Sequence, residues 1–160
     1  MNNTRAVGVV LLLLITLLGA CGGKDASSAV PPSSGQMADK LVQQMQQTKF
    51  ASLDGKMIKM MYHLDPAVLE DYAVRTPLLN VRTDEIAILK VKDAADLNAV
   101  ETAVRERAAD VQRQYESYEK AQYEKAVRYK IVTRDRYVLF VISDRADQLL
   151  QTYDSFFASK

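Results

Sequence analysis

The chain has 160 residues, and its 21 Lys and Arg almost balance its 20 Asp and Glu, so that its formal net charge is +1. This balance excludes the basic field with which a protein attracts nucleic acid or anionic lipid. The single cysteine excludes an internal disulfide, and the single histidine argues against a zinc site built from histidines, which needs three or four ligands.

The amino-terminal residues 1–20 predict a secretory signal peptide. A short polar start with one cation, Arg5, precedes an uncharged apolar run over residues 6–20. The run is shorter than the roughly 20 residues that span a membrane comfortably, and it suits the apolar region of a signal peptide. Small residues, Gly19 and Ala20, stand directly before Cys21 and favour cleavage at this point.

Residues 18–21, LGAC, resemble the lipobox of bacterial lipoproteins. The resemblance implies that the Cys21 sulfur receives a diacylglyceryl group and that the chain is then cut before this residue. The alternative is a signal helix that stays in the membrane with an incidental cysteine. A catalytic or metal-binding thiol is not expected, because no second ligand or base lies nearby in the sequence.

Cleavage before Cys21 would remove one basic residue, Arg5, and no acidic residue. The remaining chain would hold 20 basic and 20 acidic side chains, with no formal net charge. Attachment to a membrane would then depend on the lipid, because each buried methylene group contributes about 0.8 kcal/mol.

Residues 21–36 are small, polar and proline-containing, and they predict a flexible linker. Residues 37–160 have the length of a single domain. Its first helix is expected over Met37 to Phe50 and a second one around Met57 to Leu64, because apolar residues recur there at helical spacing. The pair Asp65-Pro66 predicts the start of one more short turn.

The next segments predict a first hairpin. Tyr72 to Leu79 is rich in β-forming residues, but Pro77 cannot donate a ladder hydrogen bond, which indicates an edge or interrupted strand. Glu85 to Lys92 is the clearest strand, with Ile86 and Ile88 on one face and the intervening apolar residues on the other. Residues 80–84 are expected to form the turn.

Ala94 to about Tyr118 is the strongest predicted helix, because its apolar residues recur every three or four positions. A coiled-coil partner is the alternative, and the alanines near the stripe disfavour it. Val127 to Thr133 and Tyr137 to Ile142 predict a second hairpin, whose second strand is apolar throughout and should be central. Ser143-Asp144 predicts the cap of a last helix.

This order of elements predicts an α+β domain. We expect one antiparallel four-stranded sheet made of the two hairpins, with the long helix between them. The helices are expected to pack mainly on one face of this sheet.

Several segments resemble domain of unknown function 4358. They are Tyr62-x-Leu64-Asp65, Leu69–Tyr72, Asp84–Lys92 and Tyr137–Ser143. The resemblance extends over about residues 37–160 together with the lipobox. It implies a lipoprotein of the kind found mostly in Gram-positive Firmicutes, and it assigns no activity and no catalytic residue. Family members commonly have Gly at the position of His63 and in the last hairpin, where this chain has Arg134-Asp135-Arg136.

One group of soft ligands is a candidate metal site. Thioethers of Met57, Met60 and Met61 and the imidazole of His63 are ligands that Cu(I) accepts. The same methionines and Leu64 also form a plain apolar helix face, and we favour this core interpretation. No metal and no cofactor are therefore expected.

Two further groups have a possible chemical role. Glu70-Asp71 and Asp84-Glu85 could bring carboxylates together for acid–base catalysis, but adjacent acids at element ends are commonly caps and solvated turns. A second group, of four amphipathic tyrosine rings, could bind a partner protein or a glycan. Two of them, Tyr115 and Tyr118, also continue the apolar stripe of the long helix. The four rings are Tyr115, Tyr118, Tyr123 and Tyr129.

The sequence thus predicts an extracytoplasmic lipoprotein, held on the cell membrane through the lipid on Cys21. Its expected function is that of a non-enzymatic binding or accessory module for an envelope protein or a cell-wall component such as a glycan, and not for nucleic acid. The alternative is a small-ligand receptor or a hydrolytic enzyme with a site between sheet and helix. The sequence does not indicate an oligomeric state.

Overall fold

The computed structural model describes residues 30–45 and 49–158. The predicted signal peptide, Cys21 and most of the predicted linker lie outside the described residues. In chain order, the elements are α2 (Ser34–Val42), β1 (Phe50–Ser52), α3 (Gly55–Tyr62), η1 (Pro66–Val68), β2 (Leu69–Pro77), β3 (Glu85–Val91), η2 (Ala94–Asp96), α4 (Leu97–Tyr115), α5 (Lys120–Val127), β4 (Lys130–Arg134), β5 (Tyr137–Ile142) and α6 (Ala146–Ser155).

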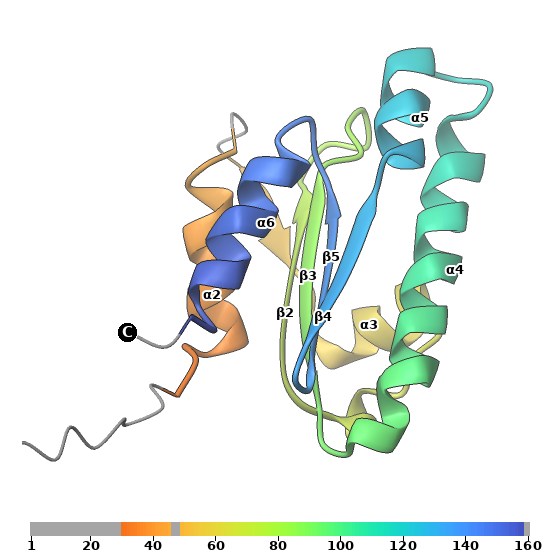
Figure 1. Cartoon of the computed structure of the whole chain (residues 1–160). Helices are drawn as coiled ribbons and strands as arrows, with labels where there is room; N and C mark the ends of the chain where they lie inside the picture. The colour runs from red at the N-terminus through yellow and green to blue at the C-terminus, as the bar shows by residue number, and fades with distance from the viewer. Residues whose placement is uncertain (1–29, 46–48, 159–160) are drawn as a thin grey trace, which may run out of the picture.

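The strands form one antiparallel sheet in the order β1-β2-β3-β5-β4 (Figure 1). The α+β fold and both hairpins are confirmed, but the prediction of four strands is wrong. Phe50–Ser52, which was expected to end or follow a helix, pairs with the end of β2 as a fifth strand. Pro77 does not mark an edge strand, because it is the last residue of β2 and interrupts no ladder.

Helices cover both faces of the sheet, so the prediction that they pack mainly on one face is wrong. α3, α4 and α5 lie on one side, and α2 and α6 lie on the other (Figure 1). β3 shows the reason, because Ile86 and Ile88 enter one core while Ala87 and Leu89 enter the other. A strand that is apolar on both faces must be covered on both.

The long helix between the hairpins is confirmed. The turn η2 and α4 together make 22 helical residues, from Ala94 to Tyr115. The predicted stripe is buried, including Val104 and Val111. The chain then reverses into α5, a short helix beside α4 that the sequence analysis did not predict.

The first turn of α2 is attached to the sheet. The Ser33 side chain caps the helix, and the Ser34 N–H donates to Asp71 Oδ2 at 2.7 Å. Residues 34–36, which belong to the range predicted as linker, are therefore helical. Among the described residues, no helix has both the length and the apolar character to cross a membrane.

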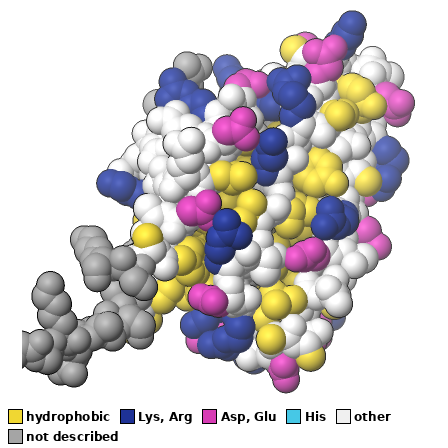
Figure 2. Space-filling view, viewed as in Figure 1, with side chains coloured by type: hydrophobic (Ala, Val, Ile, Leu, Met, Phe, Trp, Pro, Cys, Tyr) yellow, Lys and Arg dark blue, Asp and Glu magenta, His cyan; other side chains and the backbone are white. Residues whose placement is uncertain are grey.

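β4 lies at an edge of the sheet and carries a cation at each end. Lys130 pairs with Asp147 at 3.4 Å, and Arg134 pairs with Asp154 at 2.9 Å. On the face shown in Figure 2, apolar side chains alternate with such charged groups. Charges at an exposed edge strand disfavour edge-to-edge pairing of sheets.

Within the described part of the chain, two residues other than glycine have left-handed backbone conformations. His63, which ends α3, has φ 52°, and Asp135, in the β4–β5 turn, has φ 50°. Glycine adopts this conformation without a steric penalty. These are the two places where the family resemblance implies glycine.

Candidate functional site

Buried polar residues gather at the end of the sheet where β3 begins and β5 ends. Thr83, Asp84 and Glu85 are consecutive and all buried. Their side chains contact groups on three helices, α3, α4 and α5. The interpretation of Asp84-Glu85 as a solvated turn is therefore wrong.

The loop before β3 is fastened to α4 and α5. The Thr83 N–H donates to Gln122 Oε1 at 3.0 Å, and the Thr83 hydroxyl lies 3.2 Å from the Gln122 carbonyl oxygen. The Tyr115 hydroxyl lies 2.7 Å and 3.0 Å from the carbonyl oxygens of Asn80 and Arg82. Burial raises the pKa of Tyr115, so that this hydroxyl keeps its proton as a donor.

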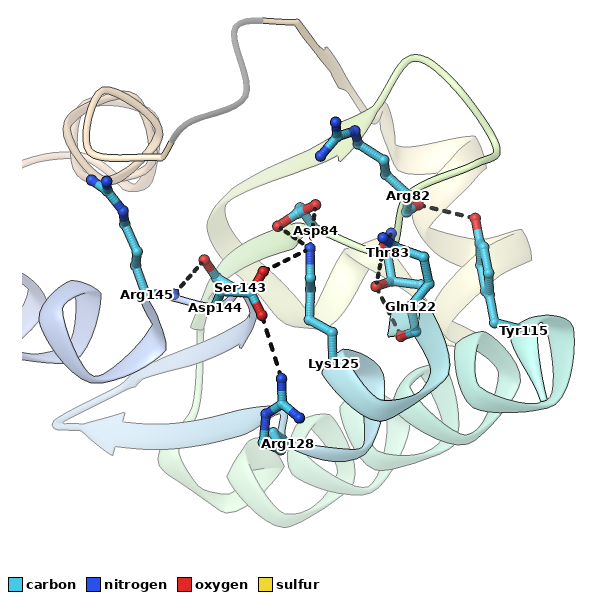
Figure 3. A network of polar contacts seen from close by, with 10 residues as sticks. All are labelled: Arg82, Thr83, Asp84, Tyr115, Gln122, Lys125, Arg128, Ser143, Asp144 and Arg145. Carbon is cyan, nitrogen blue, oxygen red and sulfur yellow. Dashed lines mark hydrogen bonds and ion pairs between the residues drawn. The ribbon is translucent and has the colours of Figure 1, made fainter. Parts of the chain in front are cut away.

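A buried lysine joins two carboxylates at this end (Figure 3). Lys125 Nζ lies 3.2 Å and 3.1 Å from the two Asp84 oxygens and 3.1 Å from Asp144 Oδ2. Arg128 also pairs with Asp144, at 3.4 Å. Only 7% of the Lys125 side chain is exposed, so the two carboxylates, and not water, compensate its positive charge.

A cavity of about 290 Å³ lies beside this lysine. Its wall contains three cationic side chains, two carboxylates, one hydroxyl and one thioether. They are Arg82, Lys125, Arg145, Asp84, Asp144, Ser143 and Met45. The Ser143 Oγ accepts a hydrogen bond from the Arg145 N–H at 3.1 Å, and Arg145 Nη1 donates to the Gln44 carbonyl oxygen at 2.9 Å.

A second buried network surrounds Glu85. Arg107 donates from Nε and Nη2 to the two Glu85 oxygens at 3.0 Å and 2.7 Å, and the Tyr62 hydroxyl donates to the same carboxylate. Burial, together with the Glu85 charge, raises the pKa of Tyr62. Burial alone would lower the pKa of Arg107, but the Glu85 carboxylate raises it. Asp84 and Glu85 thus each have a cation of their own and are not joined as an acid–base pair.

A family model described as "Domain of unknown function (DUF4358)" matches residues 43–143. The chain belongs to the DUF4358 family. No curated protein and no solved structure was found to match it. The predicted family is therefore confirmed over this range, which includes all five strands and the loop that carries Arg82. Asp144, Arg145 and α6 follow the matched part of the DUF4358 domain.

The other predicted carboxylate pair of the DUF4358 domain is also structural. Glu70 pairs with Lys90 and Arg136, and the hydrogen bond from Lys90 is the main reason that the pKa of Glu70 is lowered. Asp71 instead holds the first turn of α2. These two carboxylates therefore have separate partners.

The candidate metal ligands occupy different environments on and after α3. Met60 is 60% exposed, Met57 and Met61 are partly buried, and His63 lies 3.5 Å from Asp110 at the surface. The buried face of α3 consists of Ile58 and Tyr62 instead of the predicted methionines. Within residues 30–45 and 49–158, no three His, Cys, Asp or Glu side chains are placed to hold one metal ion.

The structure does not gather the four tyrosines, predicted as a partner surface, into one exposed surface. Tyr115 is buried, and Tyr123 and Tyr129 are half-buried against the core on the α4 side. The Tyr129 ring centroid lies 5.9 Å from that of Phe140. Only Tyr118 is exposed among the four, at 70%.

The loop between β2 and β3 carries an exposed apolar segment that was not predicted from the sequence. Leu78, Leu79 and Val81 are 57%, 66% and 51% exposed. The sequence feature that could have indicated this segment is the presence of three large apolar residues where a strand end and a turn were predicted. The same loop places Arg82 in the wall of the cavity.

Proposed function

We propose that this DUF4358 protein is an extracytoplasmic lipoprotein, anchored through Cys21, and that it acts as a non-enzymatic binding module for an envelope protein or a cell-wall component. The observation that carries the binding function is the loop between β2 and β3. It presents Leu78, Leu79 and Val81 to solvent and Arg82 to the charged cavity beside them. Exposed apolar groups beside polar ones are typical of interaction sites.

The state of the buried carboxylates favours binding over hydrolysis. Asp84 is paired with Lys125 and Glu85 with Arg107. A general base or acid needs a free oxygen within hydrogen-bond reach of the substrate. Carboxylates held by strong cationic partners are poorly suited to this role.

The anchor is tested by metabolic labelling with an alkyne-tagged fatty acid. The native chain should take up the label, and mass spectrometry should find a diacylglyceryl group on Cys21 at a new amino terminus. Cys21→Ser should take up none. An unmodified Cys21, or cleavage at another position, contradicts the proposed anchor.

The binding surface is tested by photo-crosslinking in native host cells. A photoreactive residue is placed at Leu79 or, as a matched control, at the exposed Gln151 on α6. The proposal predicts one defined adduct from position 79, none from position 151, and loss of that adduct when Leu78→Asp is added. Mass spectrometry of the adduct separates a protein from a wall polymer, and equal crosslinking from both positions contradicts the proposal.

A further inference from the structure

We propose that the cavity at the end of the sheet binds a carboxylate or phosphate group, held between Arg82 and Arg145, with the Ser143 hydroxyl as a further donor. The inference deepens the proposed function and rests on it, since the same loop forms both the exposed surface and the cavity wall. It names the chemical class of the ligand group that enters the cavity.

The charge of the cavity is the first argument. Lys125 is already neutralised by Asp84 and Asp144, and Asp144 also contacts Arg128. The wall of the cavity holds three cationic side chains and two carboxylates, all shown in Figure 3. The excess is one positive charge, which an anionic ligand would balance.

Arg82 is the residue best placed to supply such a charge. Among the described residues, its side chain has no hydrogen bond and no ion pair, whereas its backbone is held firmly. Its carbonyl oxygen accepts from the Tyr115 hydroxyl at 3.0 Å, and the neighbouring Thr83 is fixed to Gln122. The base of the Arg82 side chain is thus positioned before any ligand arrives, which reduces the entropy lost on binding.

Arg145 and Ser143 supply donors from the other side of the cavity. One guanidinium nitrogen of Arg145 donates to the Gln44 carbonyl oxygen, which leaves the remaining N–H groups of this side chain for a ligand. The Ser143 Oγ accepts from a backbone N–H, so that its own hydrogen can be donated to an anion. Figure 3 shows Arg82 and Arg145 on opposite sides of Asp84 and Lys125.

Size and geometry limit the ligand to a compact group. A cavity of about 290 Å³ is at the small end of the range for ligand pockets. A guanidinium group presents paired donors that match two oxygens of a carboxylate or phosphate. Both a free metabolite and an acidic group on a larger partner have this chemistry.

The test is a titration of the full chain in detergent micelles with glutarate or inorganic phosphate. Arginine is labelled with ¹⁵N, the ionic strength is held constant, and the neutral diamide of glutarate is the ligand control. We expect saturable shifts of the Arg82 and Arg145 Nε–H signals with an anion and none with the diamide. Tighter binding of phosphate or of glutarate indicates which group the natural ligand carries.

Two variants separate a specific site from general attraction. Arg82→Ala should weaken anion binding by at least about tenfold, which corresponds to one hydrogen bond to a charged group. Arg82→Lys should restore only part of the affinity, since a lysine lacks the paired donors. Arg105→Ala removes the same charge from an exposed site on α4 and should leave the affinity unchanged.

The inference is overturned if no arginine signal saturates, or if Arg82→Ala and Arg105→Ala weaken binding equally. Circular dichroism of each variant shows whether it folds like the native chain. An anion titration that fails while Leu79 still gives its specific adduct refutes the ligand class alone. Specific anion binding without any adduct refutes the proposed envelope partner and leaves the anion site.

Discussion

Arg107 and Glu85 form a two-contact ion pair between α4 and the first residue of β3. Both side chains are largely shielded from water, and the Tyr62 hydroxyl completes the coordination of the carboxylate. The Arg107 guanidinium also lies 5.8 Å from the centre of the Tyr62 ring. This arrangement connects α3, α4 and the sheet through charged groups in addition to their shared apolar core.

Replacement of Arg107 by Met should destabilise the protein by about 3–5 kcal/mol, because it leaves the Glu85 charge buried without a cationic partner. Urea unfolding followed by circular dichroism measures this loss. The matched control is Arg105→Met on the same helix, whose exposed pair with Glu101 should contribute about 0–1 kcal/mol. Equal losses in the two variants would refute the structural role of the buried pair.

Lys125 and Asp84 should show energetic coupling. Lys125→Met alone leaves Asp84 buried and uncompensated, so the double variant with Asp84→Asn should lose less stability than the two single losses added together. A coupling energy of about 1–3 kcal/mol is expected for groups in one ion-pair network. Lys120→Met, at an exposed position of the same helix, is the control and should show no coupling to Asp84→Asn. Additive single losses would show that the pair does not act as a unit.

Tyr115→Phe should loosen the loop that carries Arg82. The substitution removes the donor for two carbonyl oxygens, at an expected cost of about 1–3 kcal/mol. Hydrogen exchange of the Thr83 amide should become faster. Tyr118→Phe removes an exposed hydroxyl three residues later and should change neither quantity, and unchanged exchange in Tyr115→Phe would contradict this attachment.

Tyr153 should make the stability depend on alkaline pH. Burial raises its pKa above the ordinary tyrosine value of about 10, so the folded state keeps this proton after the unfolded chain has released it. Its contribution is therefore fully present below about pH 10 and is lost as the pH rises further.

The variant Tyr153→Phe tests this directly. The fall of unfolding free energy above pH 10 should become less steep by about 1.4 kcal/mol per pH unit, the value for one proton. Urea unfolding between pH 7 and pH 11 gives the slope, and the range below pH 9 is the internal reference. The same slope in both chains would show that Tyr153 releases its proton while folded.

His63→Gly and Asp135→Gly should each stabilise the protein by about 0.5–1 kcal/mol, because glycine removes the steric cost of the left-handed conformation. Thermal unfolding compares each variant with the corresponding alanine substitution. Alanine retains the steric conflict and should not stabilise. A loss of stability on His63→Gly would instead assign a net structural contribution to its contact with Asp110.

The local parts of the fold could be predicted from sequence, and the reason is the spacing of apolar residues. β3, β5 and α4 carry long regular patterns, and the structure confirms them. β1 has three residues, too few for a pattern, and its pairing with β2 is a contact over about 25 positions. The cover of the sheet on both sides follows from β3, which is apolar on both faces.

The candidate site could not be predicted, because its partners come from distant parts of the chain. Asp84 meets Lys125 across 41 positions and Glu85 meets Arg107 across 22. Charged residues in a sequence carry no mark of burial, so both carboxylates looked like part of a solvated turn. The burial of the tyrosines could not be predicted for the same reason, since Tyr129, which precedes β4, packs on Phe140 of β5.

The hydrogen bond from Ser34 to Asp71 has a consequence for the distance between the cavity and a membrane. Asp71 lies beside Lys90 near the last residues of β3, whereas Asp84 precedes its first residue. The chain thus enters the domain about 20–25 Å from the cavity, the length of a strand of seven residues. With a lipid on Cys21, the twelve residues 22–33 would lie between this point of entry and the membrane surface. Energy transfer from a dye at Val81 to labelled lipid should therefore report a cavity held well clear of the bilayer, at the height of partners that project from the membrane and not of the lipid headgroups.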